Sequence, residues 1–140
     1  MAVRVDNHTE YGTRYLRGIF AKCLSEIRKT ETRPLLSRMR VEVRYIHSRS
    51  YAWVSGYAYY HRNFVLMRVP RPGPMKDGVP PFFGPGVLRS IAKVFIHEVG
   101  HCLGKRHRRG LTIEHLYGEF LDKHFAVPLA GAATIERGKE

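Results

Sequence analysis

The sequence predicts an α+β fold in which residues 1–140 form one domain. A helical pattern of apolar residues near the N-terminus is followed by segments with strand patterns, and two further helical patterns lie in the second half of the chain. The length of 140 residues is enough for one hydrophobic core but short for two domains. A hydrophobic content of 44% is typical of a globular protein, so we expect the chain to fold.

The first predicted elements are an amphipathic helix over Thr9–Lys29, capped by Asn7 or Thr9, and a strand. The helix is indicated by apolar residues at three- and four-residue spacing, namely Tyr15, Leu16, Ile19, Phe20, Cys23, Leu24 and Ile27. After Pro34, residues 38–49 alternate charged and apolar side chains, which indicates a half-buried strand with a basic side.

Two more strands and two more helices complete the prediction. Residues 50–60 and 64–69 are rich in aromatic and β-branched side chains and are joined by a short connection. Prolines and glycines predict a loop over residues 70–86. The next helix is predicted over Val87–Leu103, with an apolar face of Leu88, Ile91, Phe95, Val99 and Cys102. Gly104 suits the left-handed backbone at its end, and a final helix is predicted over Thr112–Phe125.

The charge balance predicts polyanionic partners. The chain has 24 Lys and Arg against 12 Asp and Glu, so its formal net charge is +12, and nucleic acid is a further expected partner. Cys23 and Cys102 are too few for a disulfide framework, so both are expected to be reduced packing residues. The sequence shows no export signal or membrane span, which favours a cytoplasmic location and no membrane partner, and it does not set an oligomeric state.

Three histidines lie close together in the segment HEVGHCLGKRH, residues 97–107. His97 and His101 are four residues apart on the predicted helix, so they differ by about 40° and one turn, and both rings can reach one ion. They point away from the apolar face of that helix. Gly104 ends the helix, and His107 returns as a third ligand from outside it.

Three nitrogen ligands leave a fourth position open for water, as in a catalytic zinc site. We therefore expect one Zn²⁺ per chain, held by His97, His101 and His107. Glu98 lies beside the ligand face and is the candidate general base, which would take a proton from the water that attacks a carbonyl.

His97, Glu98, His101, Gly104 and His107 match HExxHxxGxxH, and the segment thereby resembles the zinc signature of the metzincin metallopeptidases. The resemblance implies a zincin-like fold, with an N-terminal helix backing a small mixed sheet, an active-site helix and a C-terminal helix. It implies a zinc metalloendopeptidase that binds a protein or peptide substrate in extended form along an edge strand. Residues 57–69 look like that strand, and main-chain hydrogen bonds would supply the affinity.

The chain departs from metzincins in having no methionine after Met75, where that family carries a methionine turn. Leu116, Leu121 or Leu129 would then supply the floor under the metal. A second zincin arrangement uses a carboxylate as third ligand, and Glu114 or Glu119 are candidates to replace His107. Compact SprT-like proteases share the HExxH core, and their action on DNA-associated proteins would explain the basic charge.

Two other classes fit parts of the sequence. The three-histidine spacing is similar to that of YbeY-type metal-dependent endoribonucleases, although that family has no acid at the position of Glu98. A metal-stabilised nucleic-acid-binding module without catalysis is the third class. Its surface would include the basic run Lys105–Arg109, extended by arginines at 38, 40 and 44. Tyr117 and His115 are candidates to stabilise an oxyanion, with packing as the alternative role.

Overall fold

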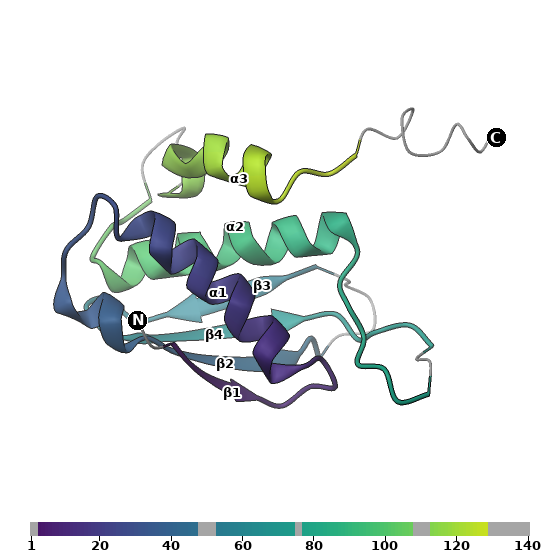
Figure 1. Cartoon of the computed structure of the whole chain (residues 1–140). Coiled ribbons are helices and arrows are strands. Elements are labelled where there is room, and N and C mark those ends of the chain that lie inside the picture. Colours follow the sequence, from purple (N-terminus) through teal and green to yellow (C-terminus); the bar gives the residue numbers. More distant parts are fainter. Residues whose placement is uncertain (1–2, 48–52, 75–76, 108–112, 129–140) are drawn as a thin grey trace.

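The computed structural model describes residues 3–47, 53–74, 77–107 and 113–128. Within them, three α-helices lie on one side of a four-stranded sheet (Figure 1). In chain order the elements are β1 Arg4–Asn7, α1 Thr13–Ile27, the 3₁₀ helix η1 Pro34–Arg38, β2 Arg40–Tyr45, β3 Ser55–Ala58, β4 Phe64–Val69, α2 Pro85–Cys102, the 3₁₀ helix η2 Ile113–Tyr117 and α3 Gly118–His124. The predicted mixture of helices and a small mixed sheet is confirmed.

The sheet has the strand order β1-β2-β4-β3. Strands β1, β2 and β4 are parallel, whereas β3 pairs antiparallel with β4 and forms one edge. In the register, Arg40 of β2 lies between Arg4 of β1 and Phe64 of β4. Helix α2 therefore follows the last parallel strand and runs back along the sheet, close to β3 (Figure 1).

The core lies between the sheet and helices α1 and α2. Alternate strand residues face the helices and are buried: Val5, Val41, Val43, Val65, Met67 and Val69. Phe20 of α1 and Phe95 of α2 are fully buried, and their ring centroids are 4.6 Å apart. This aromatic contact joins the two longest helices at the centre of the core.

The predicted strand 64–69 and the predicted long helix are confirmed, although that helix begins two residues earlier, at Pro85. Proline suits this first helical turn because it has no N–H to leave unpaired. The expected final helix is divided into η2 and α3, and Thr112 lies outside the described residues. Strand β1 is an additional element that the four polar-rich residues RVDN did not predict.

The predicted start of the first helix was wrong. Helix α1 begins at Thr13 with Gly12 as N-cap, and no side chain caps it. Asn7 instead organises the preceding loop: its amide donates to the Tyr11 carbonyl oxygen at 2.6 Å, and its side-chain oxygen accepts from the Thr9 backbone N–H at 2.9 Å. The polar residues stabilise the turn between β1 and α1 rather than the helix itself.

The assignment of residues 57–69 to an edge strand was also wrong in part. Only Tyr57 and Ala58 belong to the edge strand β3, whereas β4 is paired on both sides. The continuous apolar run in FVLMRV is typical of such an interior strand. The edge next to α2 is therefore made by residues 55–58.

Both cysteines are free and buried, as predicted. Burial raises the pKa of Cys23 and of Cys102 to about 12, so both stay neutral thiols. The Cys102 thiol donates a long hydrogen bond of 3.5 Å to the Phe64 carbonyl oxygen, which places it in the core and not at the histidines. No helix among the described residues has the length and hydrophobicity needed to span a bilayer.

Replacing Phe95 with alanine should lower the free energy of unfolding by about 3–5 kcal/mol, because the change leaves a cavity against Phe20. Chemical denaturation measures this loss. The matched control is Phe82→Ala, since Phe82 is 68% exposed and its loss should cost less than about 1 kcal/mol. Equal losses in the two variants would contradict the assignment of the core.

Candidate metal centre

Helix α2 has one face in the core and another that carries the metal-ligand candidates. Ile91, Phe95 and Val99 are fully buried, whereas His97 and His101 are partly exposed. The predicted facing of the two histidines is therefore confirmed. Because the apolar face is fixed between the sheet and α1, the histidine face has a defined direction.

The three predicted histidines come together. His97, His101 and His107 each offer one ring nitrogen, and these nitrogens lie within 4.8 Å of one another. The ring centroids of His97 and His101 are 4.7 Å apart, and the His107 ring lies 4.7 Å from the first and 4.9 Å from the second. The group could hold a metal ion.

Hydrogen bonds fix which nitrogens of the two helical histidines face the site. Nδ1 of His97 lies 2.8 Å from Oε1 of Glu114, and Nδ1 of His101 lies 2.9 Å from the carbonyl oxygen of Lys105. A backbone carbonyl only accepts, so Nδ1 of His101 carries the hydrogen and donates it, and an ionised Glu114 would accept from Nδ1 of His97 in the same way. The Nε2 atoms are then left with lone pairs.

The two Nε2 atoms face each other at 3.1 Å. Two lone pairs at this distance repel unless a metal ion or a shared proton lies between them. Tetrahedral zinc with Zn–N bonds of about 2.0–2.1 Å separates two ligand nitrogens by about 3.3 Å, which is close to the observed spacing. The arrangement of donors therefore fits a metal ion, with Glu114 and a backbone carbonyl holding the ligand rings from behind.

The turn that brings His107 to the site is built on Gly104, which has a φ of 84°. The Lys105 N–H donates to the Gly100 carbonyl oxygen and the Gly104 N–H to that of His101, both at 2.9 Å. This is the hydrogen-bond pattern of a Schellman motif, in which glycine takes the left-handed position. The predicted role of Gly104 is confirmed.

Two side chains from the segment after α1 hold the same turn. The Arg33 guanidinium donates to the Leu103 carbonyl oxygen, and the Lys105 ammonium lies 3.7 Å from the Glu31 carboxylate. The basic run Lys105–Arg109 is thus partly used inside the fold. Its members Arg108 and Arg109 lie outside the described residues.

Ile113 supplies an apolar contact behind the histidines that the sequence did not predict. A Cβ placed on Gly100 would lie 2.1 Å from Cγ2 of Ile113, so this glycine lets Ile113 pack directly on the helix between His97 and His101. Of the predicted floor residues, Leu116 is 75% exposed, Leu121 belongs to the main core, and Leu129 lies outside the described residues. The glycine inside an otherwise regular helix was the available signal.

The two glutamates proposed as alternative ligands have other positions. Glu114 is buried and contacts Nδ1 of His97, the nitrogen that faces away from the site, so it supports a ligand rather than replacing His107. Glu119 is exposed. Tyr117 packs against the core and burial raises its pKa, while His115 is exposed. The structure favours the packing role for Tyr117.

Glu98 is 9% exposed and lies against the edge strand. A Cβ on Gly56 of β3 would lie 2.7 Å from Cγ of Glu98, so the missing side chain at position 56 makes room for the carboxylate. Burial raises the pKa of Glu98, and His97 and His107 oppose this effect. The close approach of strand and carboxylate was not predicted, although a glycine within a strand is a signal for such a contact.

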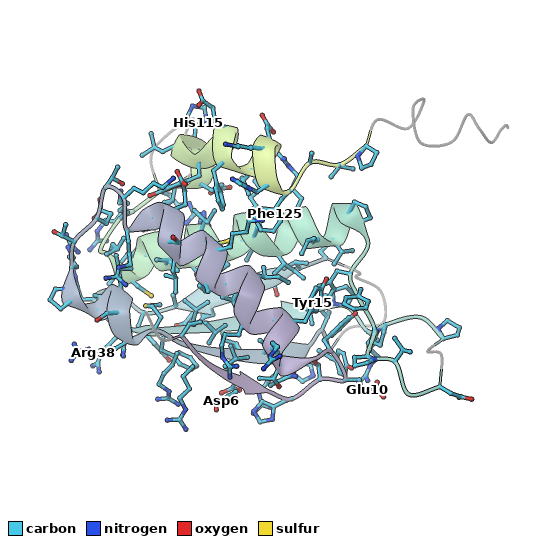
Figure 2. All side chains as sticks on the ribbon, in the orientation of Figure 1. Asp6, Glu10, Tyr15, Arg38, His115 and Phe125 are labelled. Atoms are coloured by element: carbon cyan, nitrogen blue, oxygen red, sulfur yellow. The ribbon has the colours of Figure 1, made fainter. Side chains whose placement is uncertain are left out.

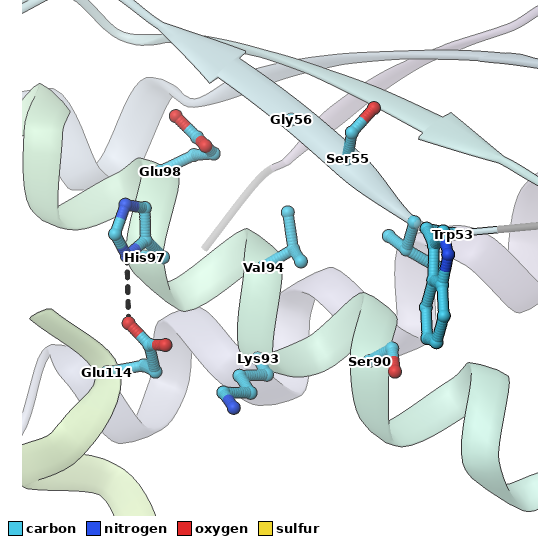
Figure 3. A pocket seen from close by; sticks show the side chains of 10 residues that line it. Trp53, Ser55, Gly56, Ser90, Lys93, Val94, His97, Glu98 and Glu114 are labelled. Carbon is cyan, nitrogen blue, oxygen red and sulfur yellow. Dashed lines mark hydrogen bonds and ion pairs between the residues drawn. The ribbon is translucent and has the colours of Figure 1, made fainter. Parts of the chain in front are cut away.

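A cleft of about 400 Å³ lies between β3 and α2. Figure 3 shows His97 and Glu98 at one end of this cleft, and Trp53 and Ser90 toward the other. Lys93 and Val94 lie between them on α2, and the dashed line marks the bond from His97 to Glu114. The cleft therefore joins the edge of the sheet to the histidine group.

Tyr60 is a further neighbour of the site. Its ring stands edge to face against that of His101, with the centroids 5.4 Å apart, and the Arg106 guanidinium lies 4.9 Å from the Tyr60 centroid. The connection between β3 and β4 thus packs on the end of α2. Sequence spacing gives no indication of this contact, because it joins segments about forty residues apart.

We expect the purified protein to contain about one zinc ion per chain by metal analysis. His101→Ala should lose it, because two of the three nitrogens cannot hold the ion as tightly. His115→Ala is the control, since His115 is exposed and outside the group. A wild-type protein without a stoichiometric transition metal would show that the three histidines do not form a metal site.

Glu114→Ala should weaken zinc binding by roughly 10–100-fold, because His97 loses the acceptor that orients it. Competition with a chromogenic chelator measures the affinity. Glu114→Gln should lose less, since its amide oxygen still accepts from Nδ1, and Glu119→Ala should bind zinc as the wild type does. A loss in the Glu119 variant instead would favour a carboxylate ligand from α3.

Comparison with known proteins adds no relative to this picture. No protein-family model matches the sequence, and no curated protein or solved structure matches it significantly. A function for the chain consequently rests on the geometry of the histidine group, of Glu98 and of the cleft beside them.

Proposed function

We propose that the protein is a zinc-dependent metallopeptidase of metzincin-like type. The observation that supports it best is the grouping of the three histidines, one of which, His97, lies with Glu98 at one end of a cleft that runs beside a sheet edge. The HExxHxxGxxH spacing, the Schellman turn at Gly104 and the apolar contact of Ile113 with Gly100 all agree with this proposal.

The cleft suits an extended peptide. Among the described strands β3 has a partner on one side only, so its other edge offers backbone N–H and C=O groups to a substrate. Alternate side chains of such a peptide would then meet Trp53 and Ser90 on one part of the cleft and Lys93 on another. Gly56 allows the substrate backbone to approach Glu98 closely.

A bound zinc ion would polarise the scissile carbonyl and make a water molecule more acidic. Glu98 accepts the proton that the attacking water gives up and passes it to the leaving nitrogen. Its burial against Gly56 raises its pKa, which makes the carboxylate a stronger base than a solvent-exposed one. Glu114 and the Lys105 carbonyl keep the imidazoles in the tautomer that binds a metal.

Glu98→Gln should retain the metal and lower peptide hydrolysis at least about a hundredfold, because an amide cannot accept the proton. Cleavage of a fluorogenic peptide library measures activity, and metal analysis of the same sample shows that the site is intact. Glu119→Gln is the control, because it makes the same chemical change at an exposed glutamate outside the histidine group.

The same samples distinguish the endoribonuclease alternative, which would use the same three histidines. If the wild type cleaves RNA but no peptide, and Glu98→Gln cleaves RNA as the wild type does, the peptidase proposal is wrong. If a metal-loaded wild type cleaves neither, the site is a structural one.

A further inference from the structure

The side of the sheet opposite the helices has no helix on it in the described part of the chain (Figure 1). We name this side the open face. Figure 2 shows Asp6 directed away from the helices, on this side. From the alternation of buried and exposed residues, the open face consists of Arg4, Asp6, Arg40, Glu42, Arg44, Ser55, Tyr57, Phe64, Leu66 and Arg68. Charged side chains and aromatic side chains lie next to each other on this face, so it is not mainly apolar.

The open face has more positive than negative charge. It has four arginines, Arg4, Arg40, Arg44 and Arg68, but only two acids. Each acid is already paired with an arginine. Asp6 lies 3.5 Å from Arg40 and 3.8 Å from Arg4, and Glu42 pairs with Arg44. Arg68 has no ion pair among the described residues, and its Nη1 is shielded from solvent without an acceptor. Four arginines against two acids leave the face with a net positive charge, which favours an anionic partner.

Aromatic rings lie among these arginines. Tyr57 is 53% exposed, and Tyr59, just beyond β3, is 55% exposed, with their ring centroids 5.1 Å apart. Phe64 lies beside Arg40 in the register, and that guanidinium stands 5.6 Å from its ring centroid. Exposed rings are costly in water unless a partner covers them, and rings next to guanidinium groups suit flat, anionic partners.

Arg40, Tyr59 and Phe64 line a hollow of about 410 Å³ together with Arg62 and Asn63. It lies where β2 and β4 begin, beside the tip of the connection from β3 to β4. Two guanidinium groups and two rings provide phosphate contacts and stacking surfaces in one place. The Asn63 amide nitrogen already donates to the Arg38 carbonyl oxygen at 2.7 Å, so this side chain offers its oxygen as an acceptor.

We propose that the open face binds a single strand of nucleic acid, with a base held in the hollow between Tyr59 and Phe64. An unpaired base offers the flat face that these rings need, and the phosphates on either side of it meet the arginines. A duplex hides its base faces in the stack, and an acidic peptide has the charge but few flat groups. The net charge of +12 agrees with a polyanionic partner.

The hollow and the metal centre lie on two sides of the same chain reversal. Tyr59 and Arg62 line the hollow, whereas Tyr60 contacts His101 and the His61 N–H donates to the Cys102 carbonyl oxygen at 2.9 Å. A bound strand would thus pass close to the metal site without using any of its ligands. The binding proposal stands whether or not the protein cleaves peptides.

The test is fluorescence anisotropy with a labelled oligothymidylate of about 20 nucleotides, long enough to cross the sheet. The double variant Tyr59→Ala/Arg62→Glu removes one ring and reverses one charge at the hollow. The matched control Phe82→Ala/Arg17→Glu removes an exposed ring and reverses a charge on the helical side. Circular dichroism shows that both proteins fold.

We expect the wild type to bind with an affinity that falls steeply with salt, the hollow variant to bind at least about tenfold more weakly, and the control to stay within about threefold. The same oligonucleotide in a duplex should bind more weakly than the single strand. The proposal is overturned if the wild type does not bind, if both variants lose affinity equally, if the duplex binds as well, or if polyglutamate competes as strongly as unlabelled oligothymidylate.

Discussion

The candidate metal centre depends on one short contact, the 3.1 Å between the Nε2 atoms of His97 and His101. These atoms can share an ion only if neither imidazole rotates, and each ring is held by an acceptor from a later part of the chain. The Lys105 carbonyl comes from the turn after α2, and the Glu114 carboxylate from η2. The segments after α2 therefore fold back onto that helix and hold its two histidine rings in place.

This constraint explains several features that would otherwise look unrelated. Gly100 has no side chain, so Ile113 can pack on α2 and carry Glu114 to His97. Gly104 reverses the chain within one turn of His101. Gly56 leaves room for Glu98 between the helix and the edge strand. In each case a glycine allows two segments to come close together. The position of a histidine or of a glutamate beside the histidines depends on that contact.

The grouping of the three histidines was predictable because its information is local. His97 and His101 share a helix face by spacing alone, and Gly104 with His107 completes a short motif. The bounds of β4 were likewise visible in a continuous apolar run. Strand β1 was not, because four residues with one buried valine give no periodic signal, and the parallel pairing with β2 that stabilises it joins distant segments. Glu114 and Tyr60 acquire their roles by tertiary contacts, so the sequence allowed Glu114 to be considered only as a ligand.

The reversals at His61 and Gly104 pack against each other, and this contact has a consequence for the third histidine. Both residues have positive φ, 62° and 84°, and a Cβ on Gly104 would lie 2.6 Å from Cε1 of the His61 ring. Because Gly104 has no side chain, the turn after α2 packs directly on the reversal at His61. Since His107 follows that turn, the place of the third nitrogen depends on both reversals, and a larger side chain at Gly104 would displace His107 as well as strain the turn.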